Sequence, residues 1–136
     1  MKYSFVLGLV LLLLAACGKS ASLESVEQTD AYGYVEKFSR TKDSYARQGL
    51  YQKYTENGVL VEEANYTNDT LNGTRVLYYE SGDTQIVENY DMGTFNGLYE
   101  VYHESGGVDQ RGTYQNNEMI GKWHRFYPNG QLMEEV

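Results

Sequence analysis

Residues 73–96, GTRVLYYESGDTQIVENYDMGTFN, can be laid without a gap over residues 97–120, GLYEVYHESGGVDQRGTYQNNEMI. Both stretches begin with glycine and have an aromatic residue five positions later, a second glycine nine positions later and a tyrosine seventeen positions later. The spacing extends to both neighbours, since Gly49 and Gly121 continue the 24-residue period. A period of this length predicts a repeat architecture, in which each unit packs mainly against the units beside it.

Each unit is predicted to form a β-hairpin. A tetrapeptide ending in glycine stands at the same place in every unit, and in the last unit it reads Tyr127-Pro128-Asn129-Gly130. Proline in second place and glycine in fourth suit a type I turn that closes with a left-handed glycine bulge. The flanking segments, 49–55 and 59–66 in the first unit, have strand length, and a connection such as 67–72 returns the chain for the next hairpin. The connection's apolar residue is expected to pack on the sheet; it is Leu71, Phe95 or Met119.

The hairpins together predict an all-β fold, a meandering antiparallel sheet of one layer. Side chains alternate between the two faces of a strand, so the residues two and five places after each repeat glycine lie on opposite faces. The first face then has a row of three aromatic side chains interrupted by a cation: Tyr51, Arg75, Tyr99 and Trp123. The second face has a row formed by Tyr54, Tyr78, Tyr102 and Phe126.

The repeat period also sets the domain boundaries. The hairpin units occupy 49–72, 73–96 and 97–120, and a partial unit occupies 121–136. Residues 31–48 do not fit the 24-residue register, although 31–40 contains three aromatic residues, so we interpret this part as an N-terminal capping strand and its connection. Residues 133–136 are expected to begin a strand that closes the sheet.

The N-terminus has the features of a bacterial lipoprotein signal. A short basic start precedes an apolar run over 5–14, which is too short to span a bilayer and suits the apolar region of a secretory signal. Leu14-Ala15-Ala16-Cys17 resembles the lipobox, and Cys17 is the single cysteine of the chain. The resemblance implies that residues 1–16 are removed and that Cys17 is acylated. Residues 17–30 are small and polar, and we interpret them as the lipidated cysteine followed by a flexible tether.

This anchor defines the expected location of the protein. Acylated Cys17 would place the chain in the cell envelope with the lipid bilayer as a partner, since two or three acyl chains anchor stably. Gly18 is not the aspartate that retains lipoproteins at the inner membrane of enterobacteria, so a Gram-negative host would favour the outer membrane.

The last unit, from Gly121-Lys122-Trp123 to Asn129-Gly130-Gln131-Leu132, resembles the MORN-repeat variant of bacterial proteins labelled YwqK-type antitoxins. The resemblance covers about residues 45–136. The second unit departs from the pattern, with Arg75 in the first aromatic place and Met92 in the place of an asparagine. The resemblance implies a sheet of stacked hairpins. A cytoplasmic antitoxin would not carry a lipobox, whereas an immunity lipoprotein that neutralises a toxin outside the cytoplasm would.

Charge and composition narrow the classes of function. The net charge of −8 and the absence of a Lys/Arg run argue against nucleic acid as a partner, because phosphates need clustered cations. A single-layer sheet offers few deep pockets, and the two histidines lie at different places in their units, so we expect no enzyme activity, metal or cofactor. Two classes remain, a protein-interaction module and a cell-wall or glycan binder. The candidate partner-binding residues are Tyr51, Arg75, Tyr99 and Trp123, because tyrosine, tryptophan and arginine are enriched at interface centres.

Overall fold

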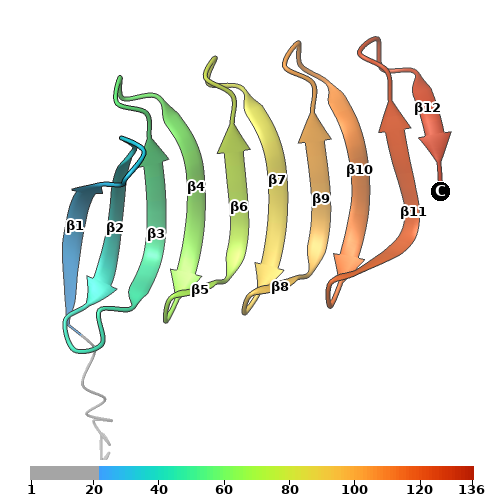
Figure 1. Cartoon of the computed structure of the whole chain (residues 1–136). Coiled ribbons are helices and arrows are strands. Elements are labelled where there is room, and N and C mark those ends of the chain that lie inside the picture. The colour runs from blue at the N-terminus through green and yellow to red at the C-terminus, as the bar shows by residue number, and fades with distance from the viewer. Residues whose placement is uncertain (1–21) are drawn as a thin grey trace, which may run out of the picture.

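The computed structural model describes residues 22–136, and within them the chain forms strands and no helix. Figure 1 shows the strands side by side in one open sheet that runs from β1 at one end to β12 at the other. The strands are β1 (Leu23–Thr29), β2 (Val35–Thr41), β3 (Arg47–Tyr54), β4 (Leu60–Thr67), β5 (Thr70–Leu71), β6 (Gly73–Tyr78), β7 (Thr84–Asp91), β8 (Thr94–Phe95), β9 (Gly97–Tyr102), β10 (Val108–Gln115), β11 (Glu118–Phe126) and β12 (Leu132–Glu135).

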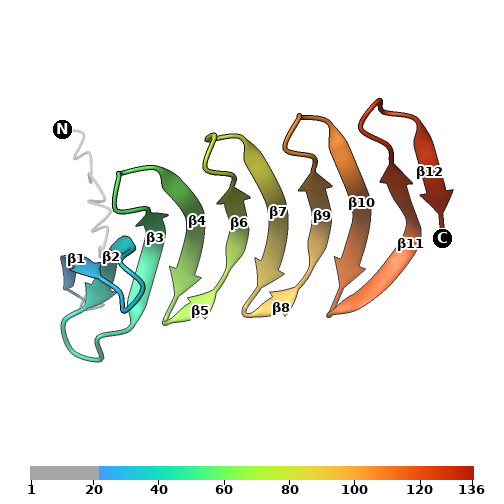
Figure 2. The same ribbon diagram turned by 45° about the horizontal axis from the view of Figure 1, so that its top comes forward.

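The sheet is the predicted antiparallel meander. Strand neighbours follow chain order throughout, and the two-residue strands β5 and β8 lie off the main path and pair with β4 and β7. The hairpins of the repeat are β3–β4, β6–β7, β9–β10 and β11–β12, and Figure 2 shows them repeated along the sheet. The all-β fold class and the hairpin repeat inferred from the 24-residue period are therefore confirmed.

The hairpin tips have the turn that the tetrapeptides predict. In the second unit the amide of Gly82 donates to the carbonyl of Tyr79 at 2.9 Å, and in the last unit Gly130 donates to Tyr127 at 2.8 Å. Both glycines have positive φ, 91° and 79°. Glycine adopts this conformation at little cost, whereas a side chain would strain it, so the recurrence of glycine follows from the backbone of the turn.

Pairing between the first three repeat hairpins is much shorter than pairing within them, whereas β10 and β11 pair over five residue pairs. Strands β6 and β7 pair over six residue pairs, whereas β4 and β6 share only Glu62↔Leu77 and Glu63↔Val76. The halves of these hairpins that lie next to the connections are therefore not paired with each other, and the connection fills part of the space between them. Phe95 of β8 stacks on Tyr90 of the preceding strand at a ring-centroid distance of 4.6 Å and on Tyr114 of the next hairpin at 5.0 Å. The apolar residue of the connection thus packs between repeats, as expected; Met119, in the last unit, is 55% exposed.

Each connection also hydrogen-bonds to the one before it. The amide of Gly93 donates to the carbonyl of Leu71 at 2.7 Å, and the amide of Asn117 donates to the carbonyl of Phe95 at 3.0 Å. These bonds require two consecutive residues of positive φ in each connection, which are Asn68-Asp69, Met92-Gly93 and Asn116-Asn117. Asparagine and glycine tolerate this region better than other residues, so methionine at φ 44° is the exception.

Replacing Met92 with asparagine should therefore stabilise the protein. The variant Met92→Asn removes a left-handed methionine, and we expect the free energy of unfolding to rise by about 1 kcal/mol, or the melting temperature by about 4 °C. Thermal unfolding followed by circular dichroism measures this. Met119→Asn is the matched control, because Met119 is as exposed as Met92 but has no positive φ. Equal effects of the two substitutions would contradict the explanation from backbone strain.

The N-terminal cap differs from the prediction in one respect. The sequence predicts a flexible tether over 17–30, but Leu23–Thr29 forms β1 and pairs with β2 along its whole length. The polar residues that suggested a tether are matched across the pair: Arg40 bonds Glu24 at 2.7 Å, and Lys37 pairs with Glu27 at 3.3 Å. Directly opposite charges stabilise a strand pair, so a polar sequence can form this edge strand. The capping strand expected within 31–48 is β2, and the closing strand expected at 133–136 is β12.

The predicted signal peptide, the lipobox and Cys17 lie outside the described residues. Among residues 22–136, no helix is long and apolar enough to cross a membrane. The fully packed part of the described sheet is small: only Tyr51, Ala64 and Trp123 are buried hydrophobic residues.

Candidate functional site

One face of the sheet carries a layer of packed aromatic rings, here called the aromatic layer. Its C-terminal part is continuous, because the ring of Tyr99 lies 5.8 Å from Trp123 and 5.7 Å from Tyr114, and Tyr114 lies 4.9 Å from Trp123. Near-perpendicular pairs such as Tyr114 and Trp123 are a favourable arrangement of aromatic quadrupoles. The members of the layer are Phe38, Tyr51, Tyr66, Tyr90, Phe95, Tyr99, Tyr114 and Trp123.

A glycine makes the space for Trp123. Gly112 on β10 lies opposite Tyr99, and a Cβ atom added to it would come within 2.0 Å of the indole ring. Trp123 is consequently only 3% exposed, with its ring lying against the backbone of β10. Within the described residues its Nε1 is the one buried side-chain polar atom without a hydrogen-bond partner.

The N-terminal part of the layer is built around Tyr51, which is 4% exposed. Its hydroxyl donates to Glu36 at 2.6 Å, and its ring contacts Phe38 and Tyr66 at centroid distances of 6.2 Å and 5.6 Å. Burial and the bond to Glu36 both raise the pKa of the Tyr51 hydroxyl, because each disfavours the phenolate. The guanidinium of Arg47 lies over the Tyr66 ring at 4.1 Å. Tyr51 is therefore held in place by the rings around it and by the hydrogen bond of its hydroxyl to Glu36.

The second unit replaces the aromatic packing with ion pairs. Arg75 donates from Nε to Glu62 at 2.7 Å and from Nη1 to Glu88 at 3.0 Å. Glu88 also accepts the hydroxyl of Tyr90, and burial together with this carboxylate raises the pKa of Tyr90 to about 12. Burial alone would lower the pKa of Arg75, but the hydrogen bonds and charges of both glutamates outweigh it and raise that pKa. Arg75 is therefore a neutralised part of the layer.

The four residues predicted to bind a partner do lie in one row of this face. The structure gives Tyr51 and Trp123 a packing role, since both are buried, while the side chain of Arg75 is 26% exposed and Tyr99 is half-buried. Partner binding by the row remains a prediction. Sequence reasoning missed the residues that face the row, Ala64, Glu88 and Gly112, although they too recur every 24 positions.

The opposite face carries exposed apolar side chains, such as Leu50 and Leu98, as well as paired polar ones. Arg111 bonds Glu100 at 2.6 Å, and Tyr102 donates its hydroxyl to the same carboxylate at 2.7 Å. The two histidines have different partners: His103 bonds the carbonyl of Phe126, whereas His124 bonds Glu135. No three His, Cys, Asp or Glu side chains converge as metal ligands among residues 22–136.

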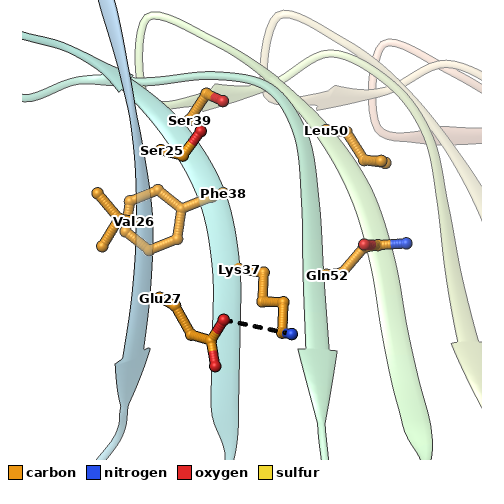
Figure 3. Close-up of a pocket in the computed structure, with 8 residues that line it drawn as sticks. All are labelled: Ser25, Val26, Glu27, Lys37, Phe38, Ser39, Leu50 and Gln52. Atoms are coloured by element: carbon orange, nitrogen blue, oxygen red, sulfur yellow. Dashed lines mark ion pairs between the residues drawn. The ribbon is translucent and has the colours of Figure 1, made fainter.

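The hollows on the described surface are open. Figure 3 shows one of about 360 Å³ near the N-terminal edge, where Leu50 and Gln52 of β3 lie beside the ion pair of Lys37 and Glu27. Val26 and Phe38 add apolar surface to it. Ligand sites of enzymes combine enclosure with several convergent polar groups, whereas this hollow is open and its two opposite charges, Lys37 and Glu27, pair with each other.

Comparison with known proteins identifies the repeat. The family model described as the MORN repeat variant matches residues 47–68, 95–116 and 119–136, which cover the hairpins β3–β4, β9–β10 and most of β11–β12. The unmatched hairpin, β6–β7, is the one in which Arg75 and Glu88 replace the aromatic and small residues of its neighbours. No protein with a curated function matches the chain. Repeats of this family are generally non-catalytic and mediate interactions with proteins or membranes. The matched segments and the stacked hairpins identify the chain as a MORN-repeat protein of the variant type.

Proposed function

We propose that the protein is an envelope lipoprotein whose repeat sheet is a non-catalytic protein-interaction module. The observation that carries the anchor is the position of Cys17, the single cysteine of the chain, directly after Leu14-Ala15-Ala16 and an apolar run. One acyl chain binds a membrane only marginally, whereas the two or three chains of a processed lipoprotein anchor it stably.

The interaction role is supported by the shape and chemistry of the sheet. An open sheet whose one face is packed by the aromatic layer presents a broad surface with shallow, open hollows such as that beside Lys37, which suits recognition of another macromolecule. Burial of Trp123 weakens the glycan-binding alternative to the extent that it relies on this ring, because a sugar needs an accessible ring to stack on. An immunity role toward an envelope-acting toxin is a special case of the same interaction module.

Substitution of the cysteine tests the anchor. We expect Cys17→Ser to abolish labelling by a fatty-acid analogue and to move the protein from the membrane fraction to the soluble fraction. Ser22→Ala, close to Cys17 in the sequence but outside the lipobox, serves as the control and should stay in the membrane fraction. Continued membrane attachment of Cys17→Ser would contradict the lipoprotein assignment.

The nature of the partner is tested separately. Crosslinking in intact cells followed by purification should recover a defined envelope protein with the wild type. Sedimentation of the purified domain with peptidoglycan, without a protein crosslink, would instead favour the glycan-binding alternative.

A further inference from the structure

The ends of the strands form two long edges of the sheet. One edge consists of the β1–β2 loop 30–34 and the hairpin tips 55–58, 79–82, 103–106 and 127–130. The other, here called the connection edge, consists of the start of β1, the β2–β3 loop 42–46 and the connections at 67–72, 91–96 and 115–120, and it lies at the bottom of Figure 1. The connection edge exposes four large apolar or aromatic side chains: Leu23 at 48%, Tyr45 at 63%, Met92 at 53% and Met119 at 55%. The tip edge exposes Tyr32 and Tyr127 as well, so the two edges are distinguished by where the N-terminal segment joins the sheet.

The start of β1 fixes where the N-terminal segment joins the sheet. The amide of Lys42 donates to the carbonyl of Ser22 at 3.0 Å, so the first described residue adjoins the β2–β3 loop on the connection edge. Ser22 is five positions after Cys17, and a chain of that length spans at most about 18 Å in any conformation. A lipid on Cys17 would therefore hold this corner of the sheet close to the bilayer surface.

We infer that the sheet stands on the bilayer along its connection edge, with the hairpin tips turned away from the membrane. This inference rests on the lipid anchor proposed above. Tyr45, three residues from the loop's contact with Ser22, is held by the Arg40 guanidinium at 4.8 Å from its ring. Tyrosine and methionine suit the boundary between headgroups and acyl chains, where an apolar body enters lipid while polar groups stay hydrated.

Charge is not what directs the edge to the membrane. The connection edge also carries Asp43, Asp91 and Glu118, all exposed, and Arg47 is already paired with Asp69 at 2.6 Å. An edge of this composition gains little from anionic headgroups. The contact is therefore apolar and tether-driven, and it should be the same on neutral and on anionic bilayers.

Site-specific fluorescence tests the orientation. Acylation blocks the thiol of Cys17, so a cysteine introduced elsewhere can be labelled selectively with an environment-sensitive nitrobenzoxadiazole dye. Met92→Cys places the dye at the connection edge, and Glu80→Cys places it at the tip of the same hairpin. The lipidated full-length variants are reconstituted on phosphatidylcholine vesicles that carry spin-labelled lipid, with and without phosphatidylglycerol.

We expect the dye at position 92 to be blue-shifted and largely quenched by the spin-labelled lipid, and the dye at position 80 to be unaffected, on both kinds of vesicle. Flotation of the vesicles measures anchoring independently of orientation. Floating protein with no quenching at position 92, or with quenching at position 80, would overturn the orientation and leave the anchor intact. Quenching only on anionic vesicles would also overturn it, and protein that does not float at all would overturn the anchor and the orientation together.

Discussion

Gly112→Ala should destabilise the protein more than any other single methyl addition to its described glycines. The new Cβ would lie 2.0 Å from the Trp123 ring, and a backbone-anchored methyl cannot move away, so the indole must leave its place. Overpacking alone costs about 1–3 kcal/mol, and loss of the packing of a buried tryptophan costs about 3–5 kcal/mol. We expect the free energy of unfolding to fall by about 3–5 kcal/mol, which corresponds to a melting temperature about 10–20 °C lower. Chemical denaturation measures it.

Two further variants separate this explanation from a general effect of replacing a glycine. In a Trp123→Leu background the clash is gone, so adding Gly112→Ala should cost only about 1 kcal/mol or less, and the double-mutant cycle should show a coupling above about 2 kcal/mol. Ala64→Gly, at the equivalent place of the first unit, should cost only about 1 kcal/mol through backbone entropy. Additive effects of Gly112→Ala and Trp123→Leu would show that the indole does not need the space of the glycine.

The sequence predicted the fold best where the same short turn motif recurs in every unit. Four glycine-closed tetrapeptides predicted four hairpins, because each turn is determined by its own residues and needs no knowledge of the rest of the sheet. Alternation then placed Tyr51, Arg75, Tyr99 and Trp123 in one row, and the structure has them there. The degree of burial of these four side chains did not follow from alternation, because it depends on the size and charge of the side chains on the neighbouring strand.

Cross-strand partners are what the sequence alone did not reveal. Tyr51 faces Ala64, Tyr99 faces Gly112 and Arg75 faces Glu88, so each large ring has a small partner and the cation has a carboxylate. These pairs are visible in the sequence only after the register of each hairpin is known. The same reason explains the error at β1, whose glutamates suggested a tether until their cations on β2 were known.

The second unit differs from its neighbours in the ion pairs of Arg75, so we expect the variant Arg75→Met to be less stable than the wild type. Methionine keeps much of the volume but leaves Glu62 and Glu88 without this counter-charge, and their side chains are only 16% and 10% exposed. Breaking a fully buried pair costs about 3–5 kcal/mol. Because Arg75 retains 26% exposure, we expect a smaller loss, about 2–3 kcal/mol in the free energy of unfolding.

If Arg75 and Glu88 act as one replaceable unit, changing both should recover what a single change loses. Arg75→Tyr combined with Glu88→Gly copies the facing pair of Tyr99 and Gly112. Lys53 is directly opposite Glu62 in the register and pairs with Asp30 at 2.7 Å, so it leaves a cation near that carboxylate. The double variant should be more stable than Arg75→Met or Arg75→Tyr by about 2 kcal/mol, as coupled neighbours require. Urea denaturation of the four proteins measures the differences. A double variant no more stable than Arg75→Tyr would contradict this explanation. It would mean that β6–β7 needs its ion pairs for a reason other than the pairing of Arg75 with Glu88, because the combination of a large ring and a small facing residue is stable in both neighbouring hairpins.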